Sequence, residues 1–223
     1  MLPSQTVENY LKTIFLAQAN LAGPSELVPV GQLASALRVV PGTATTMVKT
    51  LAESGLVRYE PYAGVRLTKA GEKLASLVLR RHRLVELFLV KVLGMSWAEV
   101  HDEAEQLEHA VSDRLIDRID EMLGRPEVDP HGDPIPTAEG RMPRPDHGNL
   151  LSAPLETPLV VTRVIDQDPD FLRFAEQHRL MPGCTVTIES REPNSDAVRL
   201  RGAAGEVVNI GSRAAAKVLA RPA

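Results

Sequence analysis

The sequence has a single cysteine, no long apolar run and no basic, apolar leader at its N-terminus. Cys184 cannot form a disulfide within the chain, which fits a reducing compartment. Every apolar run is shorter than the ~20 residues that a membrane-spanning helix needs. The first ten residues, MLPSQTVENY, lack the features of a secretory signal peptide. We therefore expect a cytoplasmic protein that does not enter a membrane.

The composition that is present indicates a globular chain of two or three small domains. Its 223 residues are 43% hydrophobic and 24% charged, a balance that is not typical of a disordered chain. Residues 1–75 carry seven basic and five acidic side chains, whereas residues 76–140 carry seven basic and fourteen acidic ones. The acidic middle argues against a passive binder of polyanions, and a bound divalent cation would offset it.

The first 75 residues have the pattern of a winged helix-turn-helix. Residues 5–19 place apolar side chains at helical spacing, and a short second helix is expected within 30–39. A third helix should begin after Pro41-Gly42 and end at Gly55. Two β-rich runs then flank a turn at Ala63-Gly64. In such a module the third helix enters the major groove of DNA.

The expected DNA contacts are exposed side chains of the third helix and of the wing. Threonine hydroxyls can contact base edges or phosphates, and threonine and proline carbons can touch a thymine methyl. Basic side chains can neutralise phosphates. The candidates are Pro41, Thr43, Thr45, Thr46 and Lys49 in the helix, and Arg58, Arg66 and Lys69 in the wing. Alternatively, the third helix is an ordinary surface helix. The order of three helices followed by a hairpin nevertheless indicates a winged helix-turn-helix more specifically than any one of these elements does.

Residues 101–109, HDEAEQLEH, carry the second informative motif. His101, Glu105, Glu108 and His109 are spaced by four, three and one, so we expect all four on one side of a helix. Two imidazoles and two carboxylates form a mixed nitrogen and oxygen ligand set that suits a first-row divalent metal. The alternative is that this acidic stretch is a solvated helix face.

A long helix over residues 69–94 precedes this motif and carries His82 and Glu86 on one face. Ser96 is expected to cap the next helix, with Glu99 three residues later in a capping box. Two adjacent helices can present both ligand sets to a shared space, and gathered carboxylates repel unless a cation or protons lie between them. Because the set contains no sulfur ligand, Mn²⁺ or Fe²⁺ fits it better than Zn²⁺ or Cu⁺.

Residues 124–154 are rich in proline and are expected to form an extended, partly ordered linker. His131 and His147 lie within it near Asp133 and Asp146, and a third metal site there is an alternative that we do not favour.

The remaining residues are expected to form a small β-barrel. Strand-like runs occur at 159–165, 185–190, 197–202 and 206–211, and residues 168–180 should form a short helix between the first two. Cys184 is expected to be a small apolar core residue and not a ligand.

These motifs resemble the DtxR/MntR family, the diphtheria-toxin-repressor-like iron- and manganese-dependent regulators. The resemblance covers nearly the whole chain and its order of motifs is specific. It is carried by VENYLKTIF at 7–15, LRVVPGTATTMVKTLAESGLV at 37–57, LTKAGEKLA at 67–75, RRHRLVELFL at 80–89, HDEAEQLEHAVSD at 101–113 and PHGDPIP at 130–136. It implies a mainly α fold with a small all-β domain: a winged helix-turn-helix, a helical metal-binding and dimerisation domain, and an SH3-like (FeoA-type) barrel.

The resemblance also implies two metal sites per chain. Glu108 and His109 match ligands of the primary site, and Glu105 stands where the manganese branch has glutamate and the iron branch has cysteine. The ancillary site of three-domain members is matched by His82, Glu86 and His101, and loosely by Asp168.

One position departs from the family pattern. Where the manganese branch has an aspartate ligand on the first helix and the iron branch a methionine, this chain has Asn9. An amide oxygen can coordinate a metal but brings no charge. A second carboxylate that some small manganese members carry three residues later is replaced by Lys12.

We therefore expect a manganese-dependent, alternatively iron-responsive, homodimeric regulator that is not an enzyme. It should repress metal-uptake genes by binding an inverted-repeat operator in double-stranded DNA. The expected domains are 1–73 for DNA binding, 74–140 for metal binding and dimerisation, 141–154 as linker and 155–223 as barrel. The competing hypotheses are a metal-independent winged-helix regulator responding to another ligand and a dinuclear metallohydrolase. No nucleophile elbow or phosphate loop supports the second.

Overall fold

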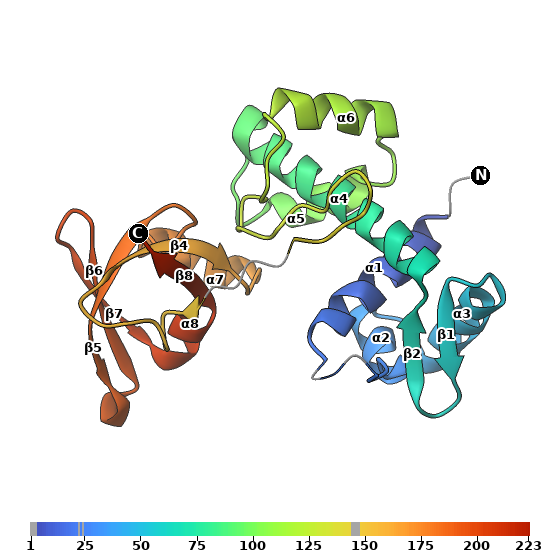
Figure 1. Ribbon diagram of the computed structural model, residues 1–223, viewed down its shortest axis with the longest axis horizontal. Coiled ribbons are helices and arrows are strands. Elements are labelled where there is room, and N and C mark those ends of the chain that lie inside the picture. Colours follow the sequence, from blue (N-terminus) through green and yellow to red (C-terminus); the bar gives the residue numbers. More distant parts are fainter. Residues whose placement is uncertain (1–3, 22, 24, 144–147) are drawn as a thin grey trace. The chain divides into compact units, whose positions relative to one another are not determined.

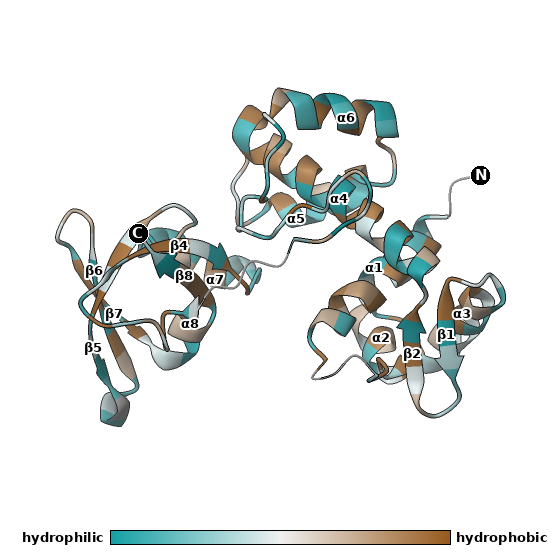
Figure 2. Cartoon of the chain, viewed as in Figure 1, coloured by the Kyte–Doolittle hydropathy of each residue, from teal (hydrophilic) through white to brown (hydrophobic). Residues whose placement is uncertain are grey.

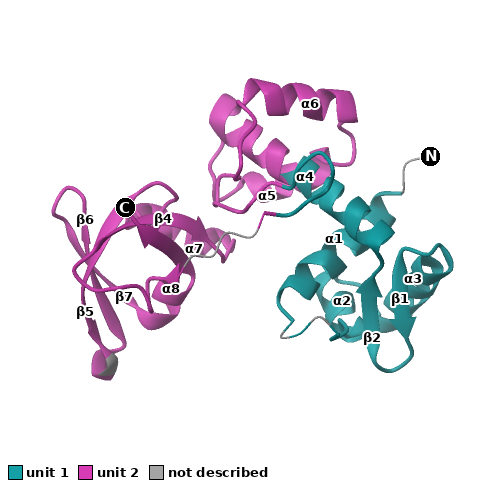
Figure 3. Cartoon of the chain, viewed as in Figure 1, with its two compact units in different colours: residues 1–82, 136–142 teal, residues 83–135, 143–223 magenta. Residues whose placement is uncertain are grey.

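The computed structural model of the protein describes residues 4–21, 23, 25–143 and 148–223. It consists of two compact units (Figure 3). Unit 1 comprises Met1–His82 and Pro136–Met142, and unit 2 comprises Arg83–Ile135 and Pro143–Ala223. No helix in the described part of the chain has the length and apolar character to span a membrane.

Unit 1 is a winged helix-turn-helix (Figure 1), which confirms the fold expected from the sequence. Its elements are α1 (Gln5–Ala19), α2 (Val30–Ala36), α3 (Pro41–Glu53), β1 (Val57–Glu60), β2 (Gly64–Leu67) and the first half of α4 (Lys69–Leu93). The Ser4 hydroxyl caps α1 by accepting from the Val7 N–H, and Pro41 starts α3, where its missing N–H costs nothing. One side of each of the first three helices is buried in a common apolar core that includes Leu11, Leu33 and Val48.

Two contacts hold α4 in unit 1. The guanidinium of Arg81 donates to the carboxylate of Glu8 on α1 at 2.8 Å, and both side chains are buried. The Thr68 hydroxyl accepts from the Gly71 N–H in the first turn of α4. Gly71 has no side chain for a structural reason: a Cβ there would lie 2.0 Å from the Leu56 carbonyl oxygen. The start of α4 therefore packs directly on backbone.

The helical part of unit 2 contains the second half of α4, α5 (Val100–Leu107) and α6 (Asp113–Met122). Ser112 caps α6, and its hydroxyl accepts from the Leu115 N–H. Ile116 and Ile119 of α6 face a core that they share with Leu84 and Val100. Polar residues stand between these apolar ones, and Figure 2 shows both kinds along the length of α6. The expected capping box at Ser96 is wrong: α5 begins only at Val100, because residues 96–99 form a turn in which the Glu99 N–H donates to the Ser96 carbonyl.

The C-terminal part of unit 2 is a strongly curved six-stranded sheet with strand order β3-β8-β4-β5-β6-β7, all pairs antiparallel. Its elements are β3 (Gly148–Asn149), β4 (Pro158–Val164), α7 (Pro169–Gln177), β5 (Thr185–Glu192), β6 (Ala197–Gly202), β7 (Val207–Gly211), α8 (Ser212–Ala216) and β8 (Val218–Pro222). Alternate residues of these strands fill one core, which also receives Trp97 and Ala98 from the segment before α5. The sequence reading missed β3, α8 and β8.

The segment expected to be an extended linker is ordered in its first half. Residues 131–136 are all buried, although they contain no helix or strand. Arg80 donates to the Pro136 carbonyl and Arg83 to the Pro134 carbonyl, which satisfies backbone oxygens that would otherwise be buried without partners. Composition alone could not show which part of the linker is ordered, because a proline-rich sequence does not reveal such long-range contacts.

We predict opposite effects of adding a methyl group at two helical glycines. Gly71→Ala should lower the free energy of unfolding by about 1–3 kcal/mol, because the Leu56 carbonyl must move away. Gly31→Ala in α2 should raise it by roughly 0.5–1 kcal/mol, because nothing lies within 4 Å of the added Cβ. Urea unfolding measures both, and a stabilised Gly71→Ala variant would contradict the close approach.

Candidate metal centre

The ligand candidates on α4 and α5 lie close to one another within unit 2. The side chain of Glu86 on α4 is 1% exposed, and its Oε1 lies 3.2 Å from Nδ1 of His101 on α5. The other ring nitrogen of His101, Nε2, lies 3.7 Å from Oε1 of Glu105, one turn later on α5. One imidazole therefore stands between two carboxylates.

Glu108 stays beside Glu105, since their carboxylate oxygens lie within 4.8 Å of each other, whereas His109 lies beyond the end of the helix that we expected to carry all four residues. The helix ends at Leu107, Glu108 is its C-cap, and His109 follows in a turn. The chain must turn here because Ser112 starts a new helix three residues later. Both side chains are nevertheless buried, and His109 Nε2 lies 3.3 Å from Oε1 of Glu108.

His82 is common to two possible ligand groups. It is the last residue of unit 1, but α4 runs unbroken through the boundary, so the helix itself fixes His82 one turn before Glu86. His82, Glu86 and His101 form one group, and His82, Glu105 and Glu108 form another. Within each group the ligand atoms lie within 4.8 Å of one another.

A third group lies entirely within unit 2 and was not expected from the sequence: Glu86, Asp129 and His131, all buried. The sequence singled out His131 with Asp133, but the carboxylates that join His131 in this group are Asp129 and Glu86. The spacing Asp-x-His was visible in the sequence, yet only the folded chain brings it to Glu86. The other half of that alternative, Asp146 and His147, lies outside the described residues.

His131 has the arrangement of a metal-ligating histidine. Its ring Nε2 lies 2.7 Å from the Trp97 carbonyl oxygen, so we assign the ring proton to Nε2, which donates to that carbonyl. This tautomer leaves a lone pair on Nδ1, which is buried and has no hydrogen-bond partner among the described residues. A backbone carbonyl that fixes one ring nitrogen while the other binds metal is the usual outer contact of histidine ligands. A divalent cation therefore fits this group.

The charge around Asp129 also favours a cation. Burial first, and then the carboxylates of Asp133 and Glu86, hold the pKa of the Asp129 carboxyl well above its usual 3.8. The guanidinium of Arg83, whose Nε lies 3.6 Å from Asp129 Oδ2, acts in the opposite direction. Burial and like charge outweigh that single arginine, so the group gains from an added positive charge.

The two remaining ligand candidates are Asn9 and Asp168. The Oδ1 atom of Asn9 on α1 is buried and has no hydrogen-bond partner in the described part of the chain, as expected for an amide oxygen able to take a ligand role. The Asp168 carboxylate instead caps α7 by accepting from the Asp170 and Phe171 N–H groups. Its assignment as a metal ligand stays a prediction.

The expected DNA-contacting side chains lie on α3 and the wing, apart from Lys69, which we expected in the wing and which is the first residue of α4. Thr43, Thr46 and Lys49 are exposed, whereas Thr45 is half-buried. The Thr45 and Thr46 hydroxyls donate to the carbonyls of the preceding helical turn, at 2.9 and 3.0 Å. Pro41, Arg58 and Lys69 are also exposed, while the Arg66 guanidinium donates to the Glu26 carbonyl. Tyr62, in the turn between β1 and β2, is a fully exposed aromatic residue with φ +65°.

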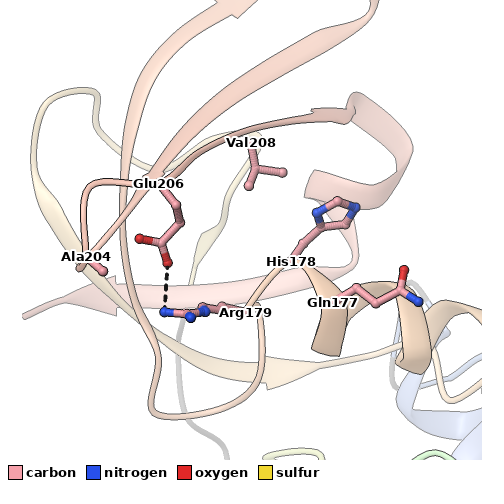
Figure 4. Close-up of a pocket in the computed structure, with 6 residues that line it drawn as sticks. All are labelled: Gln177, His178, Arg179, Ala204, Glu206 and Val208. Atoms are coloured by element: carbon pink, nitrogen blue, oxygen red, sulfur yellow. Dashed lines mark hydrogen bonds and ion pairs between the residues drawn. The ribbon is translucent and has the colours of Figure 1, made fainter.

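The barrel has a separate open hollow of about 320 Å³ (Figure 4). It is lined by Gln177, His178, Arg179, Ala204, Glu206 and Val208. Arg179 and Glu206 point toward each other across it and pair at 3.3 Å. Its charged groups therefore already satisfy one another, unlike the orphaned nitrogen of His131.

Three family models match the chain. The "Iron dependent repressor, N-terminal DNA binding domain" matches residues 3–65, the "Iron dependent repressor, metal binding and dimerisation domain" matches 68–137, and the "FeoA domain" matches 149–222. The chain belongs to the DtxR/MntR family of metal-dependent repressors, whose members are transcriptional regulators and not enzymes.

Characterised relatives share most of its length. The "Iron-dependent repressor IdeR" of Mycobacterium tuberculosis is 31% identical over 197 residues, which cover 83% of this chain and 84% of that protein. The "HTH-type transcriptional regulator MntR" of Lysinibacillus sphaericus is 34% identical over 58% of this chain and 89% of its own. A solved "Manganese-dependent transcriptional repressor complex with manganese" is 39% identical, with a TM-score of 0.86, covering 97% of this chain and 100% of its own.

We predict that Asp129→Asn changes the pH dependence of metal-free stability. Between 3.8 and the raised native pKa the folded protein binds more protons than the unfolded chain, so wild-type stability falls as pH rises through this window. An amide cannot ionise, and its oxygen can still accept from the His131 and Asp133 N–H groups. Relative to wild type, the variant should gain stability from pH 4 to pH 7.

Urea unfolding in chelator at several pH values measures this difference. A difference between variant and wild type that does not change with pH would show that Asp129 is ionised in the metal-free fold, contrary to this account.

Proposed function

We propose that the protein is a manganese-dependent transcriptional repressor of metal-uptake genes, with Fe²⁺ as the alternative metal. The observation that carries this proposal is the gathering of imidazoles and carboxylates on α4, at α5 and in residues 129–131, most of which are buried. The three groups contain nitrogen and oxygen atoms and no sulfur, which favours Mn²⁺ or Fe²⁺ over softer metals. The glutamate at position 105 also favours the manganese branch.

For the primary site we propose Glu105, Glu108 and His109, with Asn9 as a neutral fourth ligand. The burial of Glu108 and of the Asn9 oxygen supports this set. Because Asn9 brings no charge, this site should hold its cation less tightly than one with aspartate in its place.

For the ancillary site we propose His82, Glu86 and His101, to which we add Asp129 and His131. The Glu86 carboxylate lies near His82 and His101 and also near Asp129 and His131, so it would be shared between these two pairs. Asp168 is the weakest member, because its carboxylate already accepts two N–H groups.

The proposed mechanism is linkage between metal binding and DNA binding. A divalent cation supplies positive charge that offsets the gathered carboxylates when it is bound. Asn9 on α1 and the ligands Glu105, Glu108 and His109 would then bind the same cation. A shared cation would restrict the positions that the DNA-binding domain can adopt. The coupling can shift DNA affinity only as far as the cation prefers the DNA-competent state.

We propose an inverted-repeat operator bound by a homodimer. Two copies of α3 would then reach successive major grooves, ~34–36 Å apart. Thr43, Thr46 and Lys49 are exposed on α3, which supports their assignment as contacts. A regulator of transcription acts where the DNA is, so we assign the protein to the cytoplasm.

Residues of α6 are proposed as part of the dimer interface. Leu115 and Met122 are 50% and 58% exposed, although Ile116 and Ile119 of the same helix are buried. Exposed apolar side chains on one helix are typical of a surface that another protein covers. A metal-independent winged-helix regulator remains the second hypothesis, and metal dependence of DNA binding distinguishes the two.

We predict that Glu108→Gln raises the Mn²⁺ concentration needed for DNA binding by more than roughly tenfold, because it removes a buried anionic ligand without changing its shape. Fluorescence anisotropy of labelled promoter DNA of a manganese-uptake gene, titrated with metal-stripped protein and Mn²⁺, measures this. Glu103→Gln, an exposed position on the same helix, is the control. Wild-type protein that binds DNA equally with and without Mn²⁺ would refute the metal switch.

A separate prediction concerns the dimer. Leu115→Glu should weaken self-association at least tenfold, because a charge would be buried in an apolar interface. Sedimentation equilibrium measures the dissociation constant. Val207→Glu, at an apolar position of the barrel that is 45% exposed, should have no such effect. Equal dissociation constants for the two variants would exclude α6 from the interface.

A further inference from the structure

Two ligands of the buried group of Glu86, Asp129 and His131 stand on a loop with no helix or strand of its own. Within this loop, Asp129 Oδ1 accepts from the His131 N–H at 2.8 Å and from the Asp133 N–H at 2.9 Å. These bonds shape the loop but do not fix its position relative to Glu86 on α4. Part of the contact with that helix comes from Arg83 on α4, which donates to the Pro134 carbonyl, and the remaining contacts that hold Asp129 and His131 come from outside both the loop and α4.

The barrel provides the first of these outside contacts. The Val164 N–H of β4 donates to the His131 carbonyl at 2.8 Å. Gly132 has φ +83°, and a Cβ there would lie 2.0 Å from the Thr162 carbonyl oxygen and 2.7 Å from Arg163 Cα. The loop backbone is thus pressed directly on β4, at a position where only glycine fits.

The side chain of Asp133 makes the second contact. Its Oδ2 accepts from the Gln167 amide at 2.6 Å, and its Oδ1 pairs with the Arg163 guanidinium. Both partners come from the barrel. Asp133 is 3% exposed, so its charge would be costly without them. Arg83 on α4 is farther away, with its Nη2 3.7 Å from Asp133 Oδ1.

Trp97 makes the third contact. Its side chain lies in the barrel core, its carbonyl accepts from His131 Nε2, and the two rings stack with centroids 5.5 Å apart. The tautomer that leaves Nδ1 of His131 open to a metal is thus set by a residue anchored in the barrel.

We infer that Arg163 and Gln167 of the barrel are positioning residues that hold Asp129 and His131, through Asp133, in the geometry that binds a divalent cation at Glu86. The inference rests on the proposed function in one respect, namely that this group binds Mn²⁺. By linkage, a cation held there should in turn tighten the attachment of the barrel to the loop. The barrel then contributes to the metal affinity of this group through Arg163 and Gln167, which are not ligands themselves.

Arg163→Met tests this in the full-length protein. Mn²⁺ affinity at the group, measured by calorimetry, should fall by at least roughly tenfold, and Arg163→Lys should restore part of it. In chelator, hydrogen exchange of the His131 and Asp133 amides should accelerate in Arg163→Met. Arg199→Met, which removes a barrel arginine paired with Glu189, is the control and should change neither quantity.

A double-mutant cycle identifies the route. If Arg163 acts through Asp133, the effects of Arg163→Met and Asp133→Asn on Mn²⁺ affinity should not add. If Arg163→Met keeps the wild-type Mn²⁺ affinity and the wild-type amide exchange, or if the two effects in the cycle add, the inference about Arg163 is wrong. The proposed metal site would not be affected by either result. If His131→Ala binds as many Mn²⁺ ions as wild type, with equal affinity, the group is not a metal site and the inference falls with it.

Discussion

The structure of unit 2 depends on the burial of several carboxylates of like charge beside one another. Glu86, Glu108, Asp129 and Asp133 are each at most 3% exposed. Isolated buried carboxylates are costly, and neighbouring ones repel, so such a set persists only with protons, arginines or metal cations among them. Arg83 and Arg163 compensate part of this charge. Burial, together with the negative charge that remains, explains the raised pKa of Asp129, and the remaining charge also explains why the His101 imidazole faces Glu86.

The same requirement connects elements that are far apart in the sequence. The group at Glu86 is completed by a loop that is shaped by hydrogen bonds to the Asp129 carboxylate and that packs on a β-strand at Gly132. The helical part and the barrel of unit 2 are therefore held together by interactions of charged side chains as well as by apolar packing. A regulator built this way can respond to a cation by changing how firmly its parts are joined, because the cation and the joining contacts use the same side chains.

Much of the fold could be predicted from local signals in the sequence. The periodicity of residues 5–19, the Pro41 start of the third helix and the turn before Gly64 are decided by neighbours, and the structure has α1, α3 and the wing where these signals indicate. His101 and Glu105 were also readable, because four residues along a helix always bring side chains together.

The rest depends on contacts that no local pattern contains. His109 lies beyond the end of α5, because the chain turns there before Ser112 starts the next helix. The proline-rich segment is buried because Arg80 and Arg83 bind its carbonyls. Asp129 and His131 can be identified as candidate ligands only when the fold brings their segment beside Glu86. The strand β8 can be identified only from its pairing with β3 on one side and β4 on the other.

The most direct test of the account is a crystal structure of the full-length protein grown with Mn²⁺, with anomalous difference maps collected above the manganese absorption edge. The account predicts a peak bounded by Glu86, Asp129 and His131 Nδ1, with the Trp97 carbonyl still bound to Nε2, and a second peak at Glu105 and Glu108. Maps without a peak among these carboxylates, at saturating Mn²⁺, would show that protons and arginines alone hold them together and would contradict the central claim.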